Sequence, residues 1–130
     1  MRKRHMMAAM TVATILLCVP ADAADNIKLC EGTAAQGITP AIVIRACTAI
    51  IEDATGGPGV LAGAYYNRGN AYYDTADFPH AIADYDHAIR LKPNYPTAML
   101  NRGLAKKRSG DSAGGDADIA ASKALKAQSN

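Results

Sequence analysis

Residues 64–93 read AYYNRGNAYYDTADFPHAIADYDHAIRLKP, and elements of this stretch recur 34 residues further along the chain. The triplet Asn67-Arg68-Gly69 returns as Asn101-Arg102-Gly103. The same offset relates Ala64 to Ala98, Ala71 to Ala105, Asp77 to Asp111, Asp84 to Asp118, and Leu91-Lys92 to Leu125-Lys126. A repeat of this length is typical of proteins that stack pairs of helices, because a single pair cannot bury its apolar face alone.

The second half of the quoted stretch has the spacing of an amphipathic helix. Its apolar face would consist of Ala81, Ile82, Tyr85, Ala88 and Ile89. The same spacing places Asp84 and His87 on the opposite, solvated side. Pro79 falls in the first turn, where a missing amide proton does no harm, and Pro93 prevents the helix from continuing. The segment therefore predicts one helix, followed at once by another.

These residues resemble the tetratricopeptide repeat (TPR) family. The aromatic, small and proline positions of its pattern are matched by Tyr65, Gly69, Tyr72, Ala81, Tyr85, Ala88 and Pro93, and in the next repeat by Gly103. Arg68 departs from the pattern, which has leucine there. The next repeat is looser, with Met99 at the aromatic position, Lys106 at the tyrosine position and Gly115 in place of alanine. The resemblance implies an all-α fold, a short right-handed solenoid of antiparallel helix pairs.

On this interpretation the chain divides into four segments. They are a signal peptide over 1–23, a degenerate helical pair that caps the stack over 24–61, a TPR repeat over 62–95, and a second, looser TPR repeat over 96–130. Within the cap we expect helices over 27–35 and 41–53. The run Thr55-Gly56-Gly57-Pro58-Gly59 is expected to be a turn before the clear repeat.

The amino-terminal segment has the pattern of a secretory signal peptide. Positions 2–4 are basic, residues 6–19 are apolar apart from two threonines, and Ala21-Asp22-Ala23 offers a small-x-small cleavage site. We expect cleavage after Ala23 and export to the periplasm or the cell exterior, without stable membrane insertion. With this signal peptide, the chain resembles a small exported TPR protein of bacterial type. An uncleaved anchor is the alternative, although about 14 apolar residues fall short of the roughly 20 that span a bilayer.

The remainder of the chain is electrically neutral. Of 14 basic and 12 acidic residues, three basic residues and Asp22 precede Asp25, which leaves 11 of each. A neutral body has no long-range attraction for nucleic acid or an anionic membrane, so neither is expected as a partner. With 49% apolar residues in 130, the chain is long enough for one folded domain.

Export changes the interpretation of the cysteines, because thiols pair in an oxidising compartment. Cys30 and Cys47 remain after cleavage, and we expect a disulfide between them that contributes about 3 kcal/mol in the chain-entropy model. Zinc would need more ligands, and a redox pair usually has two intervening residues. Lipidation of Cys18 is a minor alternative, because Leu17 stands where lipoproteins have a small residue.

In the TPR family, the first helices of successive repeats line a concave groove that receives a peptide or a helix of a partner protein. By position, the corresponding residues here are Tyr66, Asn67, Asn70, Tyr73 and Asp74, then Leu100, Asn101, Leu104, Lys107 and Arg108. Asparagine can donate and accept hydrogen bonds to a peptide backbone, and tyrosine adds rigid contact area. The resemblance therefore implies a protein-interaction module that binds another protein or a peptide. A merely solvated helix face is the alternative.

The composition of this groove differs from that of the TPR grooves that bind carboxylates. Those use basic residues at several positions, whereas only Lys107 and Arg108 are basic here, and they also fit a solvated helix end. We therefore do not expect a carboxylate-binding groove.

Other classes of function remain as alternatives. His80, Asp84 and His87 have helical spacing that could bring them together on a metal, although such a trio is usually a solvated face. No glycine-rich phosphate loop or nucleophile motif follows a strand, so we expect no enzyme, no cofactor and no metal. Self-assembly through the open end of the stack, giving a homo-oligomeric structural module, is the further alternative.

Export predicts that the mature protein begins at Ala24 and is recovered outside the cytoplasm. Intact-mass measurement on protein purified from its natural compartment tests this prediction. A membrane-fixed product that still carries residues 1–23 would contradict cleavage and indicate an uncleaved anchor.

Overall fold

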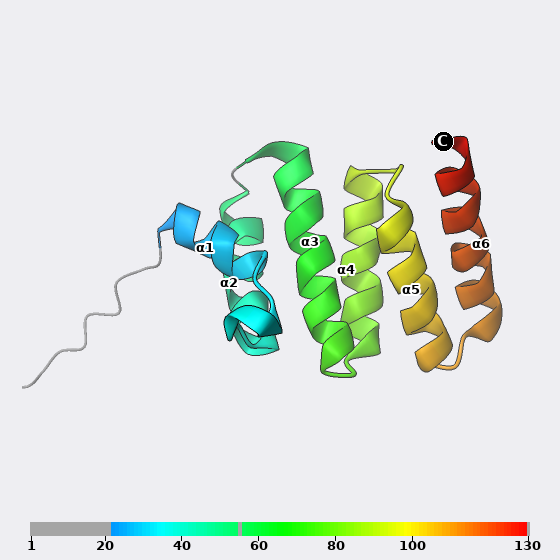
Figure 1. The fold of residues 1–130 in the computed structure, drawn as a ribbon, viewed down its shortest axis with the longest axis horizontal. Coiled ribbons are helices and arrows are strands. Elements are labelled where there is room, and N and C mark those ends of the chain that lie inside the picture. The colour runs from blue at the N-terminus through cyan, green and yellow to red at the C-terminus, as the bar shows by residue number, and fades with distance from the viewer. Residues whose placement is uncertain (1–21, 55, 130) are drawn as a thin grey trace, which may run out of the picture.

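The computed structural model describes residues 22–54 and 56–129, so the predicted signal peptide lies outside it except for Asp22 and Ala23. The helices are α1 (Ala23–Cys30), α2 (Pro40–Asp53), α3 (Gly57–Asp74), α4 (Phe78–Leu91), α5 (Pro96–Arg108) and α6 (Ser112–Gln128), with a 3₁₀ helix η1 (Ala34–Gln36) between α1 and α2. They stand in one row from α1 and α2 to α6, and each packs mainly against its neighbours in sequence (Figure 1). The expected all-α, TPR-like solenoid of helix pairs is confirmed. Over the described ranges, no helix is long and apolar enough to cross a membrane.

The two repeats turn from their first to their second helix in the same way. One residue adopts a left-handed conformation in each turn, Ala76 with φ 60° and Gly110 with φ 100°. The next residue, Asp77 or Asp111, caps the following helix, because its carboxylate accepts a hydrogen bond from the amide three residues further on. The 34-residue offset between these aspartates therefore reflects equivalent helix starts.

Close helix contact depends on glycines at the predicted packing positions. A Cβ atom built on Gly69 would lie 2.8 Å from the ring of Tyr85, which is itself buried. A Cβ atom on Gly103 would lie 2.7 Å from the carbonyl oxygen of Gly115. Gly115, which replaces the alanine of the family pattern, thus lets the backbones of α5 and α6 meet directly.

The other packing positions surround α4. Its buried residues include Ala81, Tyr85 and Ala88. Tyr65 and Tyr72, from α3, remain half-buried and stack on histidines of α4: Tyr65 on His87 with ring centroids 4.6 Å apart, and Tyr72 on His80 at 5.1 Å. Pro93 lies in the connection between α4 and α5.

The cap packs on α3 and is joined internally by a disulfide. The sulfur atoms of Cys30 and Cys47 lie 2.09 Å apart, which agrees with the predicted pairing of α1 with α2. The surrounding core contains Cys30, Val43, Ala46, Cys47 and Ile50 from the cap, with Ala64 and Ala71 from α3. The cap and the clear repeat therefore share one apolar core.

Two expectations about the cap were wrong. The helix expected over 27–35 begins at Ala23 and ends at Cys30, because the chain turns at Gly32 and then forms η1. There the amide of Thr33 donates to the side chain of Gln36, an interaction that starts a separate turn. Of the turn expected over 55–59, residues 57–59 belong instead to α3, because proline is well tolerated in a first helical turn, while residue 55 lies outside the described residues.

We expect Gly103→Ala to destabilise the protein by about 1–3 kcal/mol, because the added methyl group would force α5 away from α6. The matched control is Gly63→Ala in α3, where an added Cβ atom meets nothing within 4 Å. That change should stabilise by up to about 1 kcal/mol through helix propensity. Urea unfolding of both variants tests the difference. Equal stabilisation by the two changes would contradict a close contact between α5 and α6.

Candidate functional site

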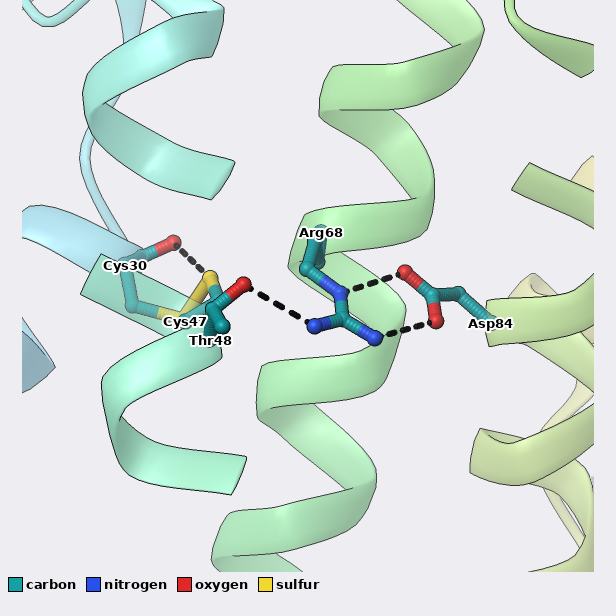
Figure 2. The surroundings of a disulfide bond; sticks show 5 residues. All are labelled: Cys30, Cys47, Thr48, Arg68 and Asp84. Carbon is teal, nitrogen blue, oxygen red and sulfur yellow. Dashed lines mark hydrogen bonds and ion pairs between the residues drawn. A yellow bond between two sulfur atoms is a disulfide. The ribbon is translucent and has the colours of Figure 1, made fainter. Parts of the chain in front are cut away.

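Arg68 joins three helices (Figure 2). Its Nε and Nη2 atoms donate to the two carboxylate oxygens of Asp84 in α4, both at 2.8 Å. Its Nη1 atom donates to the hydroxyl of Thr48 in α2 at 2.9 Å. Asp84 is only 4% exposed, so the expectation that it lies on a solvated face was wrong. A buried carboxylate needs a paired cation, and Arg68 supplies it in place of the leucine of the family pattern.

Arg102 repeats this arrangement one repeat later. Its Nε and Nη2 atoms donate to Asp118 in α6 at 2.8 and 2.6 Å, and its Nη1 atom donates to Asp86 in α4 at 2.6 Å. Lys106, at the tyrosine position of the pattern, adds an ion pair to Asp118 at 2.9 Å. Burial acts to raise the pKa of the Asp118 carboxyl, but the hydrogen bonds from Arg102 and Lys106 outweigh it and hold that pKa below its usual value.

A hydrogen-bond network crosses from α3 to α5. The side-chain oxygen of Asn70 accepts from the hydroxyl of Tyr85 at 2.7 Å and from the amide of Asn101 at 2.9 Å. The same Asn101 nitrogen donates to the hydroxyl of Tyr66 at 3.3 Å. Burial, more than any neighbouring group, raises the pKa of Tyr85 far above its usual value, so its hydroxyl stays protonated. Asn70 and Asn101 thus support the stack as well as facing the groove.

Two adjoining hollows lie along α3. The cap hollow, of about 280 Å³, lies between residues 30–43 of the cap and Asn67, Asn70 and Asp74 of α3. The repeat hollow, of about 300 Å³, is lined by Asn70, Tyr73, Asp74, Tyr85, Asn101 and Leu104. Because Asn70 and Asp74 line both, the hollows meet along one face of α3.

The structure thus brings together a subset of the predicted groove residues. Asn67, Asn70, Tyr73, Asp74, Asn101 and Leu104 line the hollows. Tyr66 lies beside them, with its ring 5.0 Å from Tyr95, and Leu100 is half-buried in α5. Lys107 and Arg108 do not line either hollow, since Lys107 pairs with Asp116 of α6 at 2.6 Å and Arg108 is exposed at the end of α5.

Sequence reasoning missed the contribution of the cap to this surface. Glu31, Thr33 and Ala34 line the cap hollow, although they were expected to belong to a packing helix. The spacing of Thr33 and Gln36 matches a capping box and could have revealed the separate turn.

The trio considered as metal ligands is not assembled. Both oxygens of Asp84 are bound by Arg68, while His80 and His87 stack on different tyrosines of α3. Among the described residues, no three histidine, cysteine, aspartate or glutamate side chains are grouped as a metal site would require.

We expect Asp118→Asn to lower the free energy of unfolding by about 1–3 kcal/mol at neutral pH, because it weakens charge-assisted hydrogen bonds. The pKa of the Asp118 carboxyl is lower in the folded state than in the unfolded chain, where it is about 4. The ionised carboxylate therefore stabilises the folded protein at pH values above about 4, and this stabilisation is lost as the pH falls through the folded-state pKa. The difference in the free energy of unfolding between the wild type and Asp118→Asn should therefore decrease in acid. Urea unfolding at a series of pH values measures it. Asp116→Asn, which removes an exposed ion pair, is the control and should have little effect at any pH. A difference in the free energy of unfolding that stays constant in acid would contradict a stabilising role of the ionised Asp118 carboxylate.

Comparison with known families gives a match within the chain. The family model of the TPR repeat matches residues 69–110, from the middle of α3 through α4 to the turn after α5. Comparison with curated proteins finds none that matches the chain. The matched region includes the close-packing Gly69, the buried face of α4 and every residue that lines the repeat hollow. This match supports the resemblance to the TPR family, whose repeats are non-enzymatic scaffolds that generally serve as protein-protein interaction modules.

Proposed function

We propose that this protein is an interaction module that binds a peptide or a helix of a partner protein along α3 and α5, in an exported compartment. The observation that carries the proposal is the pair of adjoining hollows, which extend from the cap to Leu104. A surface that spans a cap and two repeats suits a polypeptide segment better than a small enclosed ligand.

The side chains of this surface suit a polypeptide. Asn67 lines the cap hollow and, among the described contacts, has no hydrogen-bond partner, so its amide is available to a peptide backbone. Tyr73 provides an aromatic wall, held edge-on by Phe78 with ring centroids 5.5 Å apart. Leu104 is 40% exposed and offers an apolar contact at the far side of the repeat hollow.

Two features support the exported location. The apolar segment over 6–19 follows basic residues, as in secretory signals. The bonded Cys30 and Cys47 suit an oxidising compartment, where such bonds persist.

Position-specific photo-crosslinking tests the groove. A photoreactive amino acid placed at Leu104 should crosslink to a partner polypeptide in the native compartment. The matched control is Leu91, an equally exposed leucine (37%) at the end of α4 that lines none of the hollows described above. Replacement at Leu91 should leave the partner uncrosslinked.

The crosslinked products distinguish binding of a partner in the groove from self-assembly and from binding on another face. A different polypeptide attached through position 104 supports the proposed function. A covalent dimer of this chain through position 104 would indicate self-assembly instead. Crosslinking to a partner through position 91 and not through position 104 would place the interaction on another face and contradict the groove.

A further inference from the structure

The cap hollow has an apolar floor. Val43 and Ala71 are buried, Ile38 is half-buried, and Cys30 contributes one end of the disulfide. These groups belong to the shared core of the cap and α3, so the floor is held in place by packing. A group that reaches the base of this hollow therefore contacts aliphatic surface.

The rim of the same hollow is acidic. Glu31 and Asp74 are exposed, line the hollow, and form no ion pair within the described part of the chain. By contrast, Asp84, Asp86 and Asp118 are all neutralised by arginine. No lysine, arginine or histidine is among the described residues that line this hollow. The rim therefore carries negative charge without an internal counterion.

The carboxyl ends of two helices add to the negative electrostatic potential of this rim. Glu31 is the C-cap of α1, and Asp74 is the last residue of α3. A helix carries roughly half a negative charge at its carboxyl end, so positive groups are favoured there. The carboxylates and these two helix ends act in the same direction. The amino-terminal end of α2, at Pro40 in the same lining, has the opposite sign, but its partial charge is smaller than the two full carboxylate charges.

An apolar floor beneath an acidic rim matches an amphipathic cation. Lysine and arginine bury their aliphatic stems against apolar surface while their charged heads remain near water and carboxylates. We propose that the cap hollow accepts a lysine or arginine side chain of the bound polypeptide. This inference rests on the proposed function, since it assigns the chemistry of one residue of the same partner.

A selection from a library of random short peptides, with the oxidised full-length chain as target, tests the proposal. Selected peptides should share lysine or arginine at one position. Replacing that residue by norleucine, which keeps the aliphatic stem and removes the charge, should weaken binding about tenfold, as expected for loss of a charge-assisted contact. Calorimetry at low salt measures the difference, which should diminish as the salt concentration rises.

The double variant Glu31→Gln/Asp74→Asn should bind the basic and norleucine peptides equally well. The matched control is Asp25→Asn/Glu52→Gln, which removes the same charge from exposed positions outside the hollows described above. It should retain the preference of the wild type. Because all four side chains are exposed, these variants are expected to keep the fold, as circular dichroism can verify.

Leu104→Ser distinguishes failure of this inference from failure of the proposed function. Peptides whose binding depends on Leu104 but shows no preference for a basic residue would overturn the inference and leave the groove in place. Binding that is insensitive to Leu104→Ser, or a library that yields no binder, would overturn both. A basic preference that survives Glu31→Gln/Asp74→Asn would overturn the assignment to the cap hollow.

Discussion

The ion pairs of Arg68 with Asp84 and of Arg102 with Asp118 link successive helices of the stack. Each guanidinium holds a carboxylate of the next helix by two parallel hydrogen bonds and reaches back to the preceding helix. Because a bidentate pair is planar and directional, it fixes the rotation of α3 and α5 about their own axes. Asn70 and Leu104, each two residues after an arginine, are thereby directed to the face that carries the hollows.

These polar contacts are needed because the apolar core is made of small side chains. Within residues 22–54 and 56–129, eight of the 13 buried hydrophobic residues are alanines. Small residues let helices approach closely, but each removes little apolar area from water. A buried ion pair adds little net free energy over well-packed apolar groups, yet leaving one partner unpaired is strongly unfavourable. We infer that the arginines specify the register of the stack, while the Cys30–Cys47 bond holds the thin cap closed.

The cap in turn completes the candidate site. The residues after Cys30 leave α1, form η1, and so provide the wall of the cap hollow opposite α3. Had α1 continued to residue 35, Glu31 and Thr33 would have lain within a packing helix. The groove therefore combines a regular part, set by the repeats on α3 and α5, with an irregular part that only this cap supplies. The match to the TPR repeat covers the regular part alone.

The sequence by itself determined the helical repeat, because 34-residue spacing, proline positions and close-packing glycines are local and periodic features. It also indicated the cysteine pair, through the predicted export, and, through the resemblance to the TPR family, four of the α3 residues that line the two hollows. Only the tertiary structure decided the place of Asp84, since helical periodicity assigns polar residues to the solvent, whereas its partner Arg68 lies 16 residues away on another helix. The cap hollow is a mixed case. The spacing of Thr33 and Gln36 indicates a separate turn after α1, but only the tertiary structure places residues of that turn beside α3, where they line the hollow.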